Sequence, residues 1–306
     1  EVDFRDLVQK FMDIRKRAFK FPLLGKKTKF IAIPTTSGTG SEVTPFAVIS
    51  DKANNRKYPI ADYSLTPTVA IVDPALVLTV PGSVAADTGM DVLTHATEAY
   101  VSQMASDFTD GLALQAIKLV FENLESSVKN ADFHSREKMH NASTIAGMAF
   151  ANAFLGISHS MAHKIGAQFH TIHGRTNAIL LPYVIRYNGT RPAKTATWPK
   201  YNYYRADEKY QDIARMLGLP CSTPEEAVEA YAKAVYELGE RCGIEMNFKA
   251  QGIDEKEWKK HSRELAFLAY EDQCSPANPR LPMVDHMQEI IEDAYYGYKE
   301  RPGRRK

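Results

Sequence analysis

The sequence changes character at Pro81-Gly82. Before this dipeptide, short runs rich in β-branched and aromatic residues alternate with turns; after it the hydrophobic pattern is helical and strand signals mostly vanish. At 306 residues the chain exceeds the size at which a single hydrophobic core usually stops growing. We therefore expect two domains, a mixed α/β domain over 1–82 and an all-helical domain over 83–306.

The first region is expected to hold one helix and four strands. Apolar residues at helical spacing predict an amphipathic helix over 2–19. Strands are predicted at 30–33, 46–50, 57–60 and 69–73, and the turn-rich segment between the second and third predicts a hairpin. The first and last strands are continuous apolar runs, as expected of strands covered on both faces in a largely parallel sheet.

Several helix boundaries after Pro81 can be read directly. Thr223-Pro224-Glu225-Glu226 is a capping box with proline at the first helical position, and Gly243 supplies a stop. Asp254 with Glu257 repeats the capping pattern. Residues 190–210, rich in tyrosine and proline, are expected to form a long irregular connection.

Composition excludes several classes of protein. A formal net charge of +1 argues against nucleic acid or an anionic membrane as the main partner. The sequence has no apolar run long enough to span a bilayer, and its start does not resemble a signal peptide. The three cysteines, Cys221, Cys242 and Cys274, form no C-x-x-C pair, which suits a reduced intracellular protein. The expected location is the cytoplasm.

Two groups of residues have the spacing of metal ligands. Asp91 and His95 are four apart in a predicted helix and so share one face, where a carboxylate and an imidazole can hold one divalent ion; a chance pair on a helix surface is the alternative. Four of the nine histidines, at 159, 163, 170 and 173, fall between Gly156 and Gly174. Such a density of histidines favours a metal site over satisfied core residues.

The type of ligand narrows the metal. One carboxylate with several imidazoles and no thiolate suits Fe(II), Zn(II), Mn(II) or Co(II), and not calcium or a sulfur cluster. The H-E-x-x-H motif of zinc proteases is not present.

The loop Pro34–Thr44 follows the first predicted strand. Its small hydroxyl residues and two glycines let backbone N–H groups approach an anionic ligand; an ordinary surface loop is the alternative. The strand, Gly-rich turn and helix that normally hold a pyrophosphate are absent. Either the chain starts within a dinucleotide-binding domain, or it binds no such cofactor.

Together these segments resemble the iron-containing alcohol dehydrogenase family, which includes lactaldehyde reductases and butanol dehydrogenases. The likeness is carried, over essentially the whole chain, by Pro34–Thr44, Asp73–Glu98 and Gly156–Gly174. His159-Ser160-Met161-Ala162-His163-Lys164, Arg186-Tyr187-Asn188 and Asp272–Arg280 are similar to the alcohol dehydrogenase half of bifunctional aldehyde–alcohol dehydrogenases. The implied fold is a partial Rossmann-like, dehydroquinate-synthase-like α/β domain followed by an all-α metal-binding domain.

The resemblance also implies roles for individual residues. The implied metal ligands are Asp91, His95, His159 and His173. His163 would sit near the nicotinamide as a proton relay and catalytic residue, and His170 is expected to pack or hydrogen-bond near the site. The residues implied to contact the cofactor are Thr35, Thr36, Thr39, Thr44, Phe46 and Lys57, with Lys57 reaching its ribose or phosphate.

At its front the chain departs from the family pattern. The Gly-Gly-Gly-Ser turn for the pyrophosphate and the acidic residue for the adenosine ribose are missing, so Glu1 is interpreted as an internal start and NAD is not distinguished from NADP.

The implied activity is NAD(P)-dependent reduction of short-chain aldehydes to primary alcohols, and the reverse, with Fe(II), or Zn(II) as the alternative, polarising the substrate oxygen. The alternatives are a zinc polyol dehydrogenase, a metal hydrolase with the same ligands, and a mainly structural role. The implied partners are a small alcohol or aldehyde and further copies of the chain, with filaments when it is fused to an aldehyde dehydrogenase domain. Nucleic acid and membrane are not expected partners.

Overall fold

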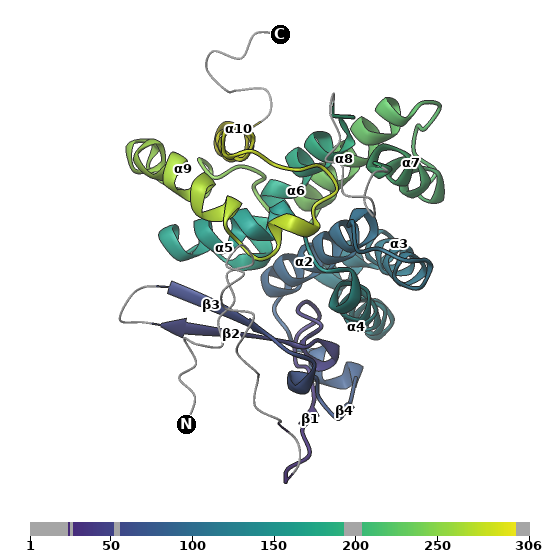
Figure 1. Ribbon diagram of the computed structural model, residues 1–306. Coiled ribbons are helices and arrows are strands. Elements are labelled where there is room, and N and C mark those ends of the chain that lie inside the picture. The colour runs from purple at the N-terminus through teal and green to yellow at the C-terminus, as the bar shows by residue number, and fades with distance from the viewer. Residues whose placement is uncertain (1–23, 25–26, 52–55, 193–203, 298–306) are drawn as a thin grey trace.

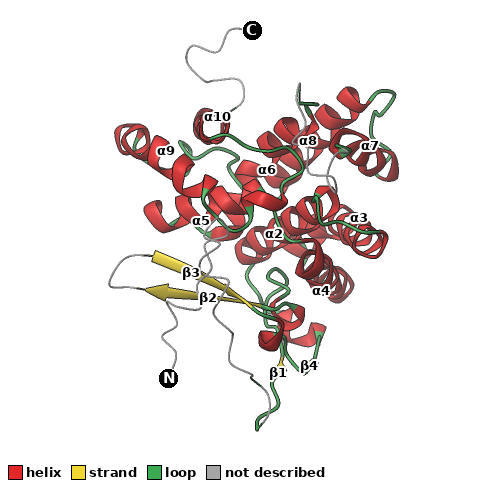
Figure 2. Ribbon diagram, viewed as in Figure 1, coloured by secondary structure: helices red, strands yellow, loops and turns green. Residues whose placement is uncertain are grey.

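The computed structural model describes residues 24, 27–51, 56–192 and 204–297. A small N-terminal α/β region lies against a largely helical remainder, which is the predicted fold class (Figure 1). Helices make up most of the described chain (Figure 2). The helix predicted over 2–19 lies outside the described residues.

The N-terminal region contains two pairs of strands. β1 (Ile31–Ala32) pairs in parallel with β4 (Val69–Ala70), and β2 (Phe46–Asp51) pairs antiparallel with β3 (Arg56–Ala61). The second pair confirms the predicted hairpin. Three short 3-10 helices separate the strands and lead into the helical part: η2 (Ser41–Val43), η3 (Tyr63–Leu65) and η4 (Pro74–Val77).

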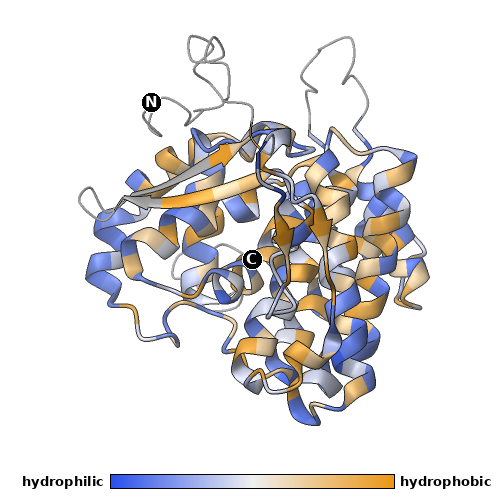
Figure 3. Ribbon diagram, turned by 90° about the horizontal axis from the view of Figure 1, so that it is seen from below, coloured by the Kyte–Doolittle hydropathy of each residue, from blue (hydrophilic) through white to orange (hydrophobic). Residues whose placement is uncertain are grey.

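The prediction that the first and last strands are covered on both faces is wrong for the described residues. Ile31 is 54% exposed and Val69 is 47% exposed. Each strand has only two residues, and within the part of the chain that the structure describes the two pair only with each other. Seen from below in Figure 3, the strands lie uncovered, with their hydrophobic residues in orange.

Nine α-helices form the described remainder of the chain. They are α2 (Gly82–Val101), α3 (Asp107–Lys129), α4 (Phe133–Ala153), α5 (Ile157–Phe169), α6 (His173–Gly189), α7 (Ala206–Met216), α8 (Pro224–Arg241), α9 (Glu255–Tyr270) and α10 (Val284–Tyr296), with a short η5 (Ser275–Ala277) before the last. α2 begins at Gly82, where the pattern of the sequence changes. The division into two domains at that point stays a prediction.

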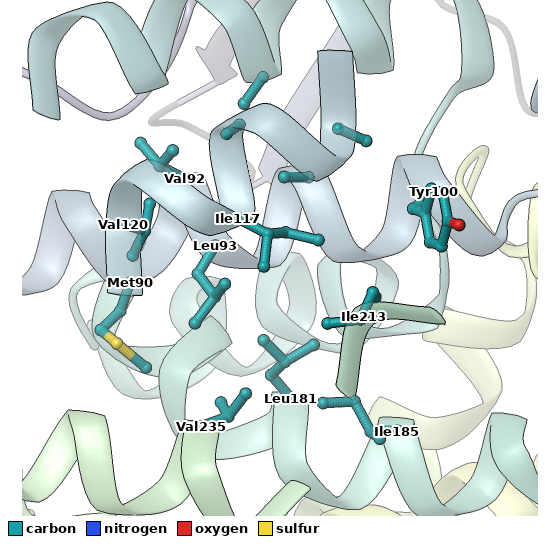
Figure 4. Close-up of a cluster of buried hydrophobic side chains, with 14 of the residues drawn as sticks. Met90, Val92, Leu93, Tyr100, Ile117, Val120, Leu181, Ile185, Ile213 and Val235 are labelled. Carbon is teal, nitrogen blue, oxygen red and sulfur yellow. The ribbon is translucent and has the colours of Figure 1, made fainter. Parts of the chain in front are cut away.

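Two clusters of buried apolar side chains hold the helices together. The first joins α2, α3, α4, α7 and α8 with one side of α6. In it, Leu93 of α2, Ile117 of α3 and Leu181 of α6 lie together (Figure 4). The second joins α5, α9 and α10. α6 belongs to both, because Leu181 packs in the first cluster and Leu180 in the second. A helix that is apolar on opposite sides must be buried between neighbours.

The predicted helix caps are present, but only half of the capping box at Thr223 forms, because the Glu226 side chain accepts from the Ser222 N–H. Thr223 accepts a hydrogen bond from the Glu226 N–H, with Pro224 at the first position of α8, and the chain turns at Gly243 with φ 80°. Asp254 accepts from two N–H groups at the start of α9. The predicted irregular connection over 190–210 is wrong at its end, because α7 begins at Ala206; residues 193–203 lie outside the description.

Within the described part of the chain, no single helix is long and apolar enough to cross a bilayer. α4 and α5 pass that test of length and composition only as a pair, and they are bent by 106° relative to each other.

Candidate metal and cofactor site

The donors predicted to bind a metal line one cleft of about 610 Å³. Its walls come from the loop before β2, from the hairpin and from helices α2, α4, α5 and α6. Asp91 and His95 reach it from α2, His159 and His163 from α5, and His173 from the first position of α6. The structure thus brings together residues that are up to 82 positions apart in the chain.

Three of these residues form a compact, buried donor group. One ligand atom each from Asp91, His95 and His159 lies within 4.8 Å of the others, and none of the three residues is more than 5% exposed. The His159 Nε2 atom lies 3.7 Å from the Asp91 Oδ1 atom. Because metal–nitrogen bonds of ~2.1 Å place neighbouring ligand atoms ~3–3.5 Å apart, only a small inward movement would bring them around one ion.

His173 approaches the same carboxylate from the open side. Its Nε2 atom lies 3.8 Å from Asp91 Oδ1, and its side chain is 39% exposed. The neighbouring Gly174 allows this approach, since a Cβ atom there would lie only 2.1 Å from the Asp87 carbonyl oxygen of α2. The fourth predicted ligand is therefore the one that borders the cleft opening.

The electrostatics of the group suit a cation. Burial raises the pKa of the Asp91 carboxyl, but the surrounding imidazoles of His95, His173 and His159 outweigh it and hold this pKa well below the usual range. Burial lowers the pKa of His95 to about 3, so its ring is neutral and has a lone pair to offer. Burial also disfavours the protonated form of His159, but the carboxylates of Asp91 and Glu98 raise its pKa to about 9. These two carboxylates therefore favour a positive charge at this position, whether a proton or a metal ion carries it.

Two buried ring nitrogens support this interpretation. Within the described residues, His95 Nδ1 and His159 Nε2 have no hydrogen-bond partner. A buried polar atom left without a partner is costly unless something binds it. The donor set of one carboxylate and several imidazoles therefore fits a divalent transition metal, which would take the place of the proton on His159.

Two further residues orient the donors and were not assigned a role from the sequence. Glu98 Oε2 lies 2.6 Å from His159 Nδ1, and its other oxygen accepts from the Ser158 N–H. Asn177 donates through Nδ2 to Asp91 Oδ1 at 2.8 Å. Such outer carboxylates and amides fix the orientation of metal-binding side chains. Glu98 is seven residues after Asp91, on the same helix face, and that spacing was a usable signal.

His163 lies beside the donor group in a different network. Its Nδ1 atom is 3.2 Å from Asp272 Oδ2, which also pairs with the Lys164 ammonium at 2.7 Å. Asp272 and Cys274 are close enough to His163 to be a second candidate metal group. The lysine bound to the same carboxylate oxygen argues against a cation there, so we interpret Asp272 as the residue that orients His163.

The expectation that His170 packs or hydrogen-bonds near the site is not met. His170 ends α5 in the left-handed region, with φ 55° and ψ 32°. It is exposed and does not line the cleft. Asn and His tolerate this backbone region better than most residues, which accounts for a histidine at this position.

Only some of the residues predicted to contact the cofactor line the cleft. Thr39, Thr44 and Phe46 line the cleft, and Phe46 stacks on Phe150, which in turn stacks on His95 at 4.4 Å. Thr35 and Thr36 follow β1 but are not among the lining residues. Lys57 lies in β3, and its side chain is outside the described part of the structure.

Comparison with protein families gives two adjoining matches. The family described as "Fe-containing alcohol dehydrogenase family, C-terminal" matches residues 85–295, and "Iron-containing alcohol dehydrogenase" matches residues 4–74. The chain is 97% identical, over all 306 residues, to an aldehyde-alcohol dehydrogenase of Streptococcus pneumoniae serotype 2. It spans 35% of the length of that relative.

Two solved structures share the fold. An iron-containing alcohol dehydrogenase from Thermococcus thioreducens has a TM-score of 0.82 and 34% identity, over 97% of this chain and 71% of the other. A sulfoacetaldehyde reductase from Bifidobacterium kashiwanohense, solved in complex with NAD+, has a TM-score of 0.73 and 31% identity. That match covers 88% of this chain and 65% of the other.

Proposed function

The chain belongs to the iron-containing alcohol dehydrogenase family, and we propose that it carries out NAD(P)-dependent interconversion of short-chain aldehydes and primary alcohols. The supporting observation is that one cleft is lined both by the donors Asp91, His95 and His159 and by the hydroxyls of Thr39 and Thr44. A hydride-transfer site needs both a polarising group and a place for a dinucleotide.

We assign the metal to Asp91, His95, His159 and His173. When bound, Fe(II) supplies Lewis acidity to the substrate oxygen and favours its ionised form near neutral pH. Zn(II) is the alternative metal, since the Irving–Williams order does not favour iron at this donor set. His173, being half open to the cleft, leaves the substrate a side from which to approach.

We assign the nicotinamide cofactor to the part of the cleft lined by Thr39, Thr44 and Phe46. The solved relative with bound NAD+ supports a dinucleotide in this fold, and NADP stays an alternative. Thr35, Thr36 and Lys57 are proposed to contact more distant parts of the cofactor. The bound nicotinamide is the hydride carrier of the reaction.

His163 is proposed to move the proton released from the alcohol. Asp272 accepts the hydrogen bond from His163 Nδ1, which fixes the tautomer and leaves Nε2 to exchange a proton. An imidazole held in this orientation can accept a proton at Nε2 and pass it on.

The aldehyde–alcohol dehydrogenase relative supports further proposals about context. We propose a cytoplasmic enzyme of fermentation that forms oligomers, with an aldehyde dehydrogenase unit in the same polypeptide. Filament formation would belong to that larger protein.

Hydride transfer separates this proposal from a metal hydrolase. Anoxically purified protein is loaded with Fe(II) and mixed with NADH, or with NADPH, and acetaldehyde; loss of absorbance at 340 nm measures reduction. The same preparation is tested with glycerol and NAD+, and with an ester. Reduction of acetaldehyde supports the proposal; ester hydrolysis without hydride transfer would replace it with the hydrolase, and a preference for glycerol with Zn(II) would replace it with the polyol dehydrogenase.

A further inference from the structure

The loop Ser37–Thr44, which presents Thr39, Ser41 and Thr44 to the cleft, rests on α4 rather than on a sheet. Ser37 Oγ lies 3.0 Å from the buried His140 Nδ1 atom. The Thr144 hydroxyl donates to Glu42 Oε1 at 2.6 Å. His140 and Thr144 are four apart on α4, so one face of this helix contacts the loop at both Ser37 and Glu42.

Glycines at three positions bring the loop against two helices. A Cβ atom at Gly40, which has φ 59°, would lie 2.7 Å from the Gly147 Cα atom of α4. A Cβ atom at Gly147 would meet Val43 at 2.7 Å, and one at Gly38 would meet Thr88 of α2 at 2.6 Å. Thr88 precedes Asp91 by three residues, so the loop is fixed to the same helix that carries two metal donors.

The burial of these anchors is costly for a surface loop. Glu42 is 3% exposed and His140 is 1% exposed, yet Glu42 Oε2 and His140 Nε2 lack partners within the described residues. A carboxylate at this depth depends on each bond that it keeps, and here the Thr144 hydroxyl supplies one. Structural loops usually lie on the surface with solvated polar groups, so an anchor of this kind points to a loop whose position matters.

We propose that His140, Thr144 and Gly147 of α4 are positioning residues for the dinucleotide. They hold the Ser37–Thr44 loop in the conformation that presents its hydroxyls and amides to the cofactor, although neither His140 nor Thr144 lines the cleft. This inference rests on the proposed function, because it assigns the cofactor to that loop. It adds that the affinity for the cofactor depends on α4, a helix of the largely helical part of the chain.

The test uses pairs of variants that differ only at the proposed contact. Thr144→Val removes the hydroxyl and keeps the shape, whereas Thr144→Ser keeps the hydroxyl. Gly147→Ala places a methyl group against Val43 and Gly40 while improving helix propensity. Its matched control is Gly111→Ala in α3, where a Cβ atom would meet nothing within 4 Å.

NADH affinity is measured by fluorescence titration of the whole chain, with metal content measured in parallel. Hydrogen exchange of the amides in 37–44 reports on the loop directly. We expect Thr144→Val to weaken NADH binding by about tenfold or more, because a lost hydrogen bond to a carboxyl group costs on that order. Gly147→Ala should weaken it as well, because the added methyl group displaces Val43 and Gly40 of the loop. Their metal content should be unchanged and their loop amides should exchange faster. Thr144→Ser and Gly111→Ala should match the wild type.

Wild-type NADH affinity in both Thr144→Val and Gly147→Ala would overturn the inference, as would unchanged exchange of the loop amides. The failure of the proposed function looks different: the wild type itself would not bind NADH or NADPH. In that case exchange still decides whether α4 holds the loop, and only its assignment to a dinucleotide is lost.

Discussion

Glu98 Oε2 lies 2.6 Å from His159 Nδ1, and both side chains are almost fully buried. This contact leaves Nε2, the nitrogen nearer Asp91, as the donor available to a metal. It also raises the basicity of the ring, which strengthens its bond to a cation. The metal affinity of this site therefore depends on a residue that is not itself proposed as a ligand.

We predict that Glu98→Gln lowers metal affinity by about 10–100-fold, because outer-shell partners of metal-binding histidines contribute on that order. Competition with a chelator of known affinity measures the change. The control is Glu122→Gln, which removes an exposed carboxylate on α3 that pairs only loosely with Lys118, at 3.9 Å. Equal metal affinity in Glu98→Gln and wild type would show that the contact does not tune the metal.

Asp91→Asn and His159→Ala should each be purified with most of the metal missing. Each removes a central member of the donor group, and loss of one ligand should cost at least the ~10–100-fold that loss of an outer-shell partner costs. Elemental analysis after parallel purification measures occupancy. His170→Asn is the control, since this residue is exposed and asparagine tolerates its left-handed backbone. Full occupancy in either site variant would show that the ligands are misassigned.

His163→Ala should keep its metal and lose catalytic rate by on the order of 10²–10⁴-fold, the usual contribution of a general acid or base. Rates of alcohol oxidation are compared at equal metal content. Lys164→Gln keeps the His163–Asp272 contact and should lose much less. Were His163→Ala instead to lack metal, His163 would be a ligand and one of the other histidines would be misassigned.

Asp272 is expected to make folding stability sensitive to acid. Burial raises the pKa of the Asp272 carboxyl, but His163 and Lys164 lower it by a larger amount. The pKa in the folded protein therefore lies well below the usual range. A depressed carboxyl pKa contributes stability that is fully present above the unfolded value of ~3.9 and is lost as the pH falls through the folded pKa.

Urea unfolding between pH 6 and pH 2.5 should therefore show a shallower acid loss in Asp272→Asn than in wild type, although the variant is less stable at neutral pH. Asp212→Asn removes an exposed carboxylate instead and should follow the wild type. Parallel acid profiles for wild type and Asp272→Asn would show that Asp272 is not the source of the acid sensitivity.

Metal identity gives a further prediction, because affinity alone does not favour iron. If Fe(II) is native, alcohol oxidation should decay in air as the metal is oxidised. Fe(II) added to the metal-free protein without oxygen should restore more activity than Zn(II). Air-stable activity with zinc alone would overturn the iron assignment and leave the ligand assignment intact.

Local sequence patterns predicted the helices and strands better than they predicted which elements pack against one another. The four-residue spacing of Asp91 and His95 was enough to place both on one face of a helix, because helix geometry fixes that relationship. The contact between Glu98 and His159 joins residues 61 positions apart, which no local pattern reveals. The exposed faces of β1 and β4 were missed for the same reason, since an apolar run does not say what covers it.

Contacts between distant motifs explain residues that the sequence only marked as unusual. Asn188 and Asn278 came from two motifs that carried the family resemblance but had no role. In the structure, Asn278 Nδ2 donates to Asn188 Oδ1 at 2.7 Å, and both residues are buried. Asn278 also lies beside the first turn of α5, where Ile157 N–H points at it. Asn278 thus contacts the start of α5, the helix that carries His159 as its third residue.

The shared position of α6 has a consequence for how the molecule comes apart. Asp91 and His95 belong to a helix of the first hydrophobic cluster, and His159 to a helix of the second, while α6 is the element common to both. A bound ion would be a further cross-link between these two packing units, in addition to the apolar contacts of α6. With the cross-link the whole helical region should melt in one cooperative step, and without it the two units should part at different temperatures, so that calorimetric cooperativity itself becomes a signature of metal occupancy.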